Sequence, residues 1–193
     1  MKDIITEEFA LKLLKRYSKS GTKGSYRIVS SDAKRLSKLA VAYAKKAVKN
    51  GHDIDIGFVA SASLLHDIGR FRYPPFAKDN IRHGIEGARI LKKEGLSRRY
   101  QDVCLNHIGA GLRRSDIIRQ NLPLPKKDFM PKTKEEIIIS YADLRFHEGR
   151  VVGIVRESRR YESFQKGLGK RVLQFHNRVM KLIGADNKVR NIR

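Results

Sequence analysis

The chain has few residues of the kinds that stabilise a fold covalently or bind ligands by stacking. Its one cysteine, Cys104, cannot form an internal disulfide, so the fold does not depend on oxidation. Tryptophan is absent and aromatic residues make up only 8% of the chain, which weakens the case for an aromatic platform that stacks nucleic-acid bases. Five prolines and 15 glycines are too few for a disordered or fibrous chain. What remains is a globular protein, and its length predicts a single domain over residues 1–193.

Long apolar runs are missing as well. No stretch approaches the ~18 apolar residues that a bilayer-spanning helix needs. The N-terminal sequence, MKDIITEEFALKLL, carries acidic residues before any apolar stretch and has no small-residue cleavage site, which argues against a secretory signal. The sequence therefore predicts a cytoplasmic protein with no membrane partner.

Acidic residues are scarce relative to basic ones. The chain has 20 Asp and Glu against 42 Lys and Arg, a formal net charge of +22. Such a charge attracts polyanions, among them nucleic acids, nucleotides and phosphorylated metabolites. A solvated basic surface with no ligand of its own is the alternative. The basic residues are spread along the chain rather than gathered in an arginine-rich arm, so the composition leaves both interpretations open.

Helical periodicity runs through nearly the whole sequence. A basic loop is expected over residues 19–30, and a helix after it, ended by Asn50-Gly51. No convincing alternation typical of strands is present, so the sequence predicts an all-α fold. Two amphipathic segments, near residues 156–166 and 170–183, predict a C-terminal helical appendage. The apolar face of the helix after the loop is expected to comprise Leu36, Leu39, Ala40, Tyr43, Ala47 and Val48.

Capping residues mark three helix starts. Thr6 can cap a first helix. Asp55 can cap a helix over residues 56–68, which is apolar nearly all round and should be buried at the centre of the fold. Thr133 and Glu136 form a capping-box pattern that opens a helix over residues 135–147. Further helices are expected over residues 83–94, 97–108 and 115–121.

An adjacent His66 and Asp67 end the apolar helix. An ionised carboxylate at a buried position costs several kcal/mol unless it is paired or binds a metal. The following residues, Ile68-Gly69-Arg70, should turn the chain outward, so both side chains can project into one cleft. Imidazole and carboxylate are ordinary ligands of divalent transition metals.

Three more residues with metal-binding side chains follow, each near an expected helix end. His83 begins a helix, His107 ends one, and Asp143 lies in the apolar stretch IIISYADL, where it should face inward. The helices would thus each bring one or two ligands towards a common interior point. A lone histidine on a helix is usually a core or surface residue, but the ordered set predicts a metal centre.

At these residues the chain resembles a known family. The string ASLLHDIGR, residues 62–70, is similar to the signature of the HD-domain superfamily of metal-dependent phosphohydrolases in its HDIG form. The resemblance is closest to a small archaeal HDIG family, and covers about residues 25–185. It also includes residues 83–91, 106–112, 131–136, 140–143 and 173–180.

The resemblance implies an HD-domain helical bundle around a metal centre, with its core over about residues 25–148 and C-terminal helices over about 150–185. It implies one or two bound divalent ions, with Mn, Mg, Fe, Co, Ni and Zn all open. His66 and Asp67 match the family's metal-binding pair, Asp143 its distal Asp, and His83 and His107 the two histidines that allow a second metal.

The first histidine of the family pattern is missing. Setting His-x-x-x-Val-x-x-x-Ala against this chain places Leu36 and Ala40 in the apolar positions and Asp32 in the ligand position. Aspartate can bind a metal, but next to Ser30-Ser31 it can equally be the N-cap of its helix. The sequence leaves both roles open.

The implied reaction is hydrolysis of a phosphoester. Metals would bind the phosphate oxygens as Lewis acids and lower the pKa of a bound water, which becomes the nucleophile. Asp67 is the natural bridging ligand, because one carboxylate has two oxygens. Arg70, one turn beyond Asp67, is the first candidate to neutralise the phosphate, and Arg113 and Arg114 are the next. Asp67 and Arg70 are thus the expected catalytic residues.

Two functions from different classes follow. The leading one is a metal-dependent phosphohydrolase that acts on a nucleotide or another phosphorylated small molecule. The alternative is a basic nucleic-acid-binding helical module, in which the metal site is structural or degenerate. The ordered ligands favour the enzyme, while the charge of +22 and the missing histidine favour the binding module.

Overall fold

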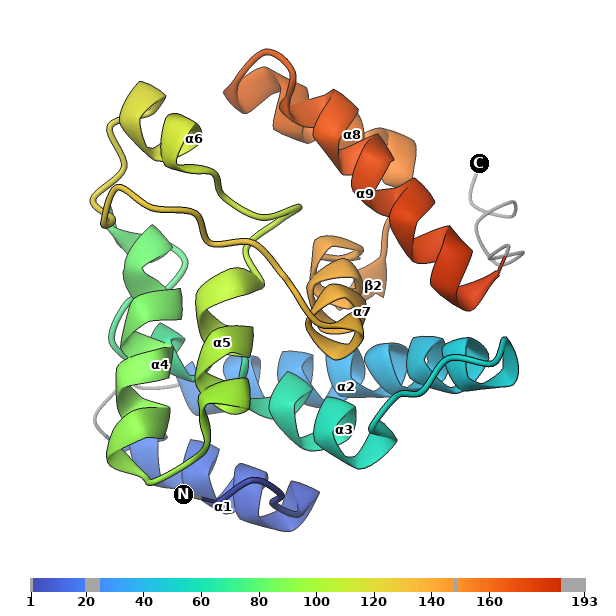
Figure 1. Cartoon of the computed structure of the whole chain (residues 1–193). Helices are drawn as coiled ribbons and strands as arrows, with labels where there is room; N and C mark the ends of the chain where they lie inside the picture. Colours follow the sequence, from blue (N-terminus) through green and yellow to red (C-terminus); the bar gives the residue numbers. More distant parts are fainter. Residues whose placement is uncertain (1, 20–24, 148, 185–193) are drawn as a thin grey trace.

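The computed structural model describes residues 2–19, 25–147 and 149–184, where nearly all of the regular secondary structure is helical (Figure 1). This confirms the predicted all-α fold. None of the described helices is both long and apolar enough to cross a membrane. In chain order the elements are α1 (Glu7–Ser18), α2 (Ser25–Lys49), α3 (Ile56–Leu65), the 3₁₀ helices η1 (Ile68–Phe71) and η2 (Asn80–Arg82), α4 (His83–Lys93), α5 (Arg98–Asn106), α6 (Arg114–Arg119), α7 (Lys134–Leu144), the strands β1 (Phe146–His147) and β2 (Arg150–Val151), α8 (Ile154–Phe164) and α9 (Leu168–Ile183).

The three predicted N-caps are present. Side-chain oxygens of Thr6, Asp55 and Thr133 each accept a hydrogen bond from the backbone N–H three residues later, at 2.9–3.1 Å. The reciprocal half of the capping box at Thr133 is replaced. The buried carboxylate of Glu136 accepts instead from Asn106 Nδ2, at 2.9 Å, and from the backbone N–H of Lys132, at 3.2 Å. Glu136 therefore ties α7 to the end of α5.

Helix α3 lies at the centre of the fold, as its all-round apolar sequence predicts. Residues 58–65 are all buried, and α3 contacts α1, α2, α5 and α7. The helix ends at Leu65, three residues before the expected end. The chain leaves the α conformation at Asp67, whose φ of −106° and ψ of 16° start the 3₁₀ helix η1. His66 and Asp67 thus lie on a turn rather than inside a helix.

Helix α2 begins earlier than the sequence suggests. The loop expected over residues 19–30 is wrong from Ser25 onward, and residues 20–24 lie outside the described part of the chain. Ser30 is buried, and this packing outweighs the weak helix propensity of serine. Asp32 is therefore the eighth residue of α2 and not its N-cap. Val48, expected on the apolar face, is 42% exposed.

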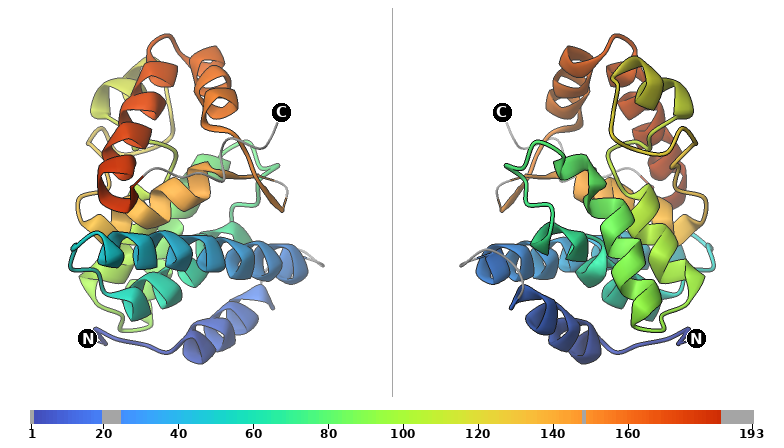
Figure 2. Two further views of the ribbon diagram at one scale, coloured as in Figure 1. Left: turned by 90° about the vertical axis from the view of Figure 1, so that its right-hand side faces the viewer. Right: turned by 90° about the vertical axis from the view of Figure 1, so that its left-hand side faces the viewer.

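Helices α8 and α9 form the predicted C-terminal pair, at the opposite end of the molecule from α1 (Figure 2). The apolar stripe of α9 is buried, and Gly167, with a φ of 91°, makes the turn between the two helices. After α7 the strands β1 and β2 pair antiparallel, with Phe146 opposite Val151. The division into a core over residues 25–148 and an appendage over 150–185 stays a prediction. The buried apolar stripe of α9 comprises Val172, Phe175, Val179 and Ile183.

A buried ion pair joins α6 to this C-terminal pair. Asp116, 1% exposed, accepts from both terminal nitrogens of Arg171 in α9 and from the backbone N–H of Arg113. Burial by itself raises the pKa of Asp116, but the hydrogen bonds from Arg171 and Arg113 outweigh it and hold the pKa below its usual value. The carboxylate is therefore ionised and paired at neutral pH.

We expect Asp116→Asn to lower the free energy of unfolding by roughly 3 kcal/mol at pH 7, because it leaves the Arg171 charge buried without a partner. Since the folded-state pKa lies below the unfolded one, the stabilisation is complete above pH ~4 and is lost as the pH falls through the folded-state value. Urea unfolding of both proteins between pH 3 and pH 7 measures this. The control is Glu8→Gln, which removes an exposed pair with Lys12 and should change stability by less than ~1 kcal/mol. Equal effects of the two substitutions would contradict the role of Asp116.

Candidate metal centre

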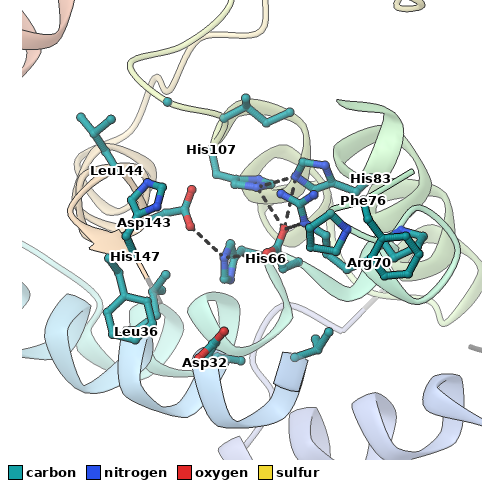
Figure 3. A pocket seen from close by; sticks show the side chains of 18 of the residues that line it. Asp32, Leu36, His66, Arg70, Phe76, His83, His107, Asp143, Leu144 and His147 are labelled. Atoms are coloured by element: carbon teal, nitrogen blue, oxygen red, sulfur yellow. Dashed lines mark hydrogen bonds and ion pairs between the residues drawn. The ribbon is translucent and has the colours of Figure 1, made fainter. Parts of the chain in front are cut away.

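Five side chains singled out from the sequence converge at one point of the bundle (Figure 3). Each comes from a helix end, where the chain changes direction and the side chain can point along the helix axis. Four helices therefore contribute to one site. His66 and Asp67 follow α3, His83 is the first residue of α4, His107 is the C-cap of α5, and Asp143 lies in the last turn of α7.

The ligand atoms form two clusters that share His107. One comprises His66, His107 and Asp143, and the other Asp67, His83 and His107; within each cluster the atoms lie within 4.8 Å of one another. Nε2 of His66 lies 3.4 Å from Asp143 Oδ1, and Nε2 of His83 lies 3.2 Å from Asp67 Oδ1. Each cluster could hold one metal ion.

Each histidine ring is oriented by a main-chain carbonyl. Nδ1 lies within hydrogen-bond distance of the carbonyl oxygen three residues earlier, at 2.7 Å for His66, 2.6 Å for His83 and 2.9 Å for His107. A carbonyl oxygen only accepts, so Nδ1 carries the proton and donates. In the neutral ring, Nε2 then presents its lone pair to the cluster. Such a second hydrogen bond is typical of histidines that bind metals.

The surroundings of these Nε2 atoms call for a positive charge there, either a proton or a metal ion. Nε2 of His66 is buried and has no hydrogen-bond partner among the described residues. The Nε2 atoms of His83 and His107 lie 3.1 Å apart, so two lone pairs would face each other unless a proton or a metal ion lies between them. Imidazole nitrogen and carboxylate oxygen together suit a divalent transition metal. The residues present therefore fit the metal that the sequence predicts.

The charges around the cluster influence one another strongly. Burial lowers the pKa of His66, but the charges of Asp67 and Asp143 outweigh burial and raise it to about 9. Burial lowers the pKa of His83 to about 3, against the opposing charge of Asp67. Burial would raise the pKa of Asp67, yet the charge of Arg70, and then those of the histidines, holds it well below its usual value. The carboxylate of Asp67 is thus ionised at neutral pH and attracts cations.

The cluster lines a cavity with a volume of about 910 Å³. Arg70 lines the same cavity, and its Nε donates to Asp67 Oδ1 at 3.2 Å. Arg113 and Arg114 do not line it. They are exposed at the start of α6, where their backbone N–H groups donate to Asp116 and Asp128. Their contact with a phosphate stays a prediction, which the lining of the cavity does not support.

Main-chain contact at Gly69 holds the two sides of the site together. A Cβ atom at Gly69 would lie 2.0 Å from the carbonyl oxygen of His83 and 2.7 Å from the backbone nitrogen of Gly87. Only glycine allows η1 to approach α4 this closely. The short segment that carries His66 and Asp67 is therefore packed directly against the start of the helix that carries His83.

Comparison with known protein families agrees with this geometry. The model of the HD domain matches residues 33–145, more than half of the chain and the part that carries all five His and Asp residues of the two clusters. The chain belongs to the HD-domain family. The predicted resemblance is confirmed.

Three curated relatives of this HD domain come from archaea. An uncharacterised protein of Methanocaldococcus jannaschii, MJ0778, is 35% identical over 76% of this chain and 79% of its own length. A protein of Thermoplasma volcanium named tRNA (cytidine(56)-2'-O)-methyltransferase is 33% identical over 96% of this chain and 50% of its own length. A protein of the same name from Picrophilus torridus is 35% identical over 68% of this chain and 37% of its own length. The chain thus spans half or less of the two methyltransferase relatives.

Solved structures share the fold. The HD domain of the phosphodiesterase PgpH of L. monocytogenes superimposes with a TM-score of 0.54 and 19% identity, over 92% of this chain and 90% of that one. The same domain in complex with cyclic-di-AMP gives a TM-score of 0.54 and 18% identity, over 94% and 98%. At this level of identity the likeness shows the fold alone.

Asp32 lies in the wall of the cavity of this HD domain but belongs to neither cluster of the described residues. Burial raises its pKa; the charge of Arg35 opposes this, and the charge of Asp67 adds to it. Asp32 is therefore close enough to the cluster for their charges to interact. Its place inside α2 excludes a capping role. Its role as a metal ligand stays a prediction.

Several residues of the cavity wall could not be selected from the sequence. Arg160 and Tyr161 of α8, His147 of β1 and Phe76 of the loop after η1 all line the cavity. A Cβ atom at Gly109, two residues after His107, would lie 2.6 Å from the hydroxyl oxygen of Tyr161. The sequence shows Arg159 and Arg160 as a basic pair, but the side that α8 turns to the cavity depends on its packing against α9.

We expect metal binding by the HD domain to follow the membership of the clusters. His107→Ala should weaken binding at both sites, and His83→Ala at one, each by at least the roughly 10–100-fold that follows the loss of a supporting group. Titration of the metal-free protein with Co²⁺ or Mn²⁺, with metal content measured after dialysis, gives affinity and stoichiometry. His52→Ala, outside both clusters, is the control and should bind as the wild type does. Two sites of wild-type affinity in His107→Ala would show that the clusters are not the metal centre.

Proposed function

We propose that this HD domain is a metal-dependent phosphohydrolase. The observation that carries the proposal is the pair of adjoining His/Asp clusters, joined through His107 and lying beside a guanidinium group in one cavity. Two metal sites side by side are a common arrangement for the displacement of an oxygen from phosphorus, because both the attacking and the leaving oxygen can be stabilised. The phosphodiesterase PgpH, which shares the fold, supports the same chemistry.

Each residue has a distinct part in the proposed reaction. His66, His107 and Asp143 would hold one divalent ion, and Asp67 and His83, with His107 between them, a second. Asp32 would add a carboxylate on the α2 side. When bound, the ions supply Lewis acidity towards the phosphate and make hydroxide available near neutral pH.

Arg70 binds and orients the phosphate in this proposal. Its Nε donates to Asp67, which holds the guanidinium beside the cluster, and Arg70 lines the cavity. A planar guanidinium can donate two parallel hydrogen bonds to phosphate oxygens. The cavity, at about 910 Å³, is at the large end of the range for small-molecule sites, so it accommodates a phosphorylated molecule of nucleotide size.

Hydrolysis of an aryl phosphate in the presence of Mn²⁺ or Co²⁺ tests the proposal. We expect turnover that a chelator abolishes and that added metal restores. Arg70→Gln should lower kcat/KM by about 100-fold, the loss typical of one removed donor to developing negative charge. The matched control is Arg114→Gln, a change of the same kind at an exposed position outside the cavity, which should leave turnover unchanged.

Two results would count against a phosphohydrolase. One is an absence of metal-dependent turnover across nucleotide and phosphoester substrates, when the metal content is shown to be full. The other is an equal loss in Arg70→Gln and Arg114→Gln, which would trace the effect to net charge rather than to the cavity.

RNA binding is a second candidate function, and the charge and the relatives favour it. The formal net charge is +22, and two relatives of this chain are named as tRNA methyltransferases. We propose that the basic surface binds RNA, independently of the metal centre. The two functions are compatible, because RNA is itself a phosphoester.

We expect affinity for RNA to fall steeply with salt, because each phosphate contact releases bound counterions. For about four contacts to single-stranded RNA, the affinity should drop roughly 50-fold between ~50 and ~200 mM salt. Fluorescence anisotropy with a labelled oligonucleotide measures this. Asp67→Asn should bind equally well, since the proposed surface does not include the metal centre. No binding at ~50 mM salt would end the RNA hypothesis and leave the phosphohydrolase intact.

A further inference from the structure

One exposed apolar side chain belongs to the cavity. Phe76 is 81% exposed, more than any other large apolar residue in the described part of the chain, and it lines the cavity that holds the metal cluster (Figure 3). The other large apolar residues that are more than a third exposed do not line it. An exposed phenyl ring at a ligand site gains free energy when a flat apolar group covers it. The exposed large apolar residues outside the cavity are Ile4, Val48, Ile118, Val155, Phe164 and Leu173.

The loop that carries Phe76 is held in place. Pro74 and Pro75 precede the ring and restrict the backbone, and the N–H of Ala77 donates to the Pro74 carbonyl at 2.9 Å. Asn80 Nδ2 donates to the Pro75 carbonyl at 2.6 Å. The ring is therefore presented by a short, hydrogen-bonded turn.

The same asparagine connects the loop to the metal centre. The carbonyl of Asn80 accepts the hydrogen bond from Nδ1 of His83, at 2.6 Å, while its side chain holds the loop at Pro75. One residue thus positions both the aromatic ring and a predicted metal ligand. The two hydrogen bonds of Asn80 therefore constrain the position of the Phe76 loop relative to His83. Such a constraint is needed when one ligand must contact both the ring and the cluster.

We propose that Phe76 is a specificity-determining residue that stacks against a planar base of the substrate while the phosphate lies at the metal cluster. The proposal rests on the proposed phosphohydrolase function and names the group attached to the phosphate. A ring at the cavity edge and a guanidinium at the cluster match the two ends of a nucleotide, one flat and apolar and the other anionic. One aromatic contact suffices here, because the phosphate supplies the other point of attachment.

The test compares two ligands that differ only in the base. The methylene phosphonate analogues of adenosine 5′-monophosphate and ribose 5-phosphate carry the same anionic group on the same sugar and cannot be hydrolysed, so calorimetric titration of the metal-loaded protein measures binding without turnover. We expect the wild type to bind the nucleotide about 10–100-fold more tightly, the range of one base stacked on an aromatic ring. Phe76→Ala should lose most of this difference and bind the ribose 5-phosphate analogue as before.

Two further variants sharpen the result. Phe76→Tyr keeps a stacking ring and should retain the preference for the nucleotide. Ile118→Ala truncates an exposed apolar side chain, 51% exposed, that does not line the cavity, and should change neither affinity. Since Phe76 makes little contact with the core, Phe76→Ala should unfold at the wild-type temperature.

Each outcome bears on the proposal. Equal binding of the two ligands by the wild type, binding of neither, or the same loss for both in Phe76→Ala would overturn it. A Phe76-dependent preference together with no metal-dependent hydrolysis of any phosphoester would instead refute the phosphohydrolase and leave a nucleotide-binding site. The failure of the inference and that of the function are therefore separable.

Discussion

The site depends on the partly buried carboxylate of Asp67, whose side chain is 25% exposed. Its Oδ1 lies 3.2 Å from His83 Nε2, 3.4 Å from His107 Nε2 and 3.2 Å from Arg70 Nε, and its Oδ2 lies 3.7 Å from His66 Nε2. A charge at the end of an apolar helix is tolerated only with such partners. The partners come from three other elements, so the bundle has to bring those elements together for Asp67 to stay ionised. The packing of helices that forms the fold therefore also forms the site.

The helices and their caps could be predicted from the sequence because they depend on neighbours along the chain. Periodicity locates α3 and α9, and Thr6, Asp55 and Thr133 act through bonds to residues three positions away. The His and Asp residues of the two clusters could be selected because their types and order match a known family. Both predictions rest on short segments of the sequence.

What could not be predicted depends on how the helices are rotated and where loops lead. Arg113 and Arg114 follow a turn whose direction no local pattern specifies, and they lie outside the cavity. Arg160 faces it only because α8 is packed on α9. The true start of α2 depends on the burial of Ser30, and with it the position of Asp32 inside the helix. These are tertiary effects, and they decide which charged side chains reach the ligand.

The contact at Gly69 has a consequence for how the site can vary over evolution. The segment after α3 touches the carbonyl of His83 and the backbone of Gly87 with no side chain in between. Main-chain atoms therefore set the distance between the segment with His66 and Asp67 and the helix with His83. Main-chain atoms are the same for every residue type. Residues elsewhere in the core can be exchanged for larger or smaller ones while this spacing is kept. Cavity-wall residues such as Phe76 and Arg160 lie outside this contact, so a change in their side chains would alter the shape of the cavity without moving the two clusters.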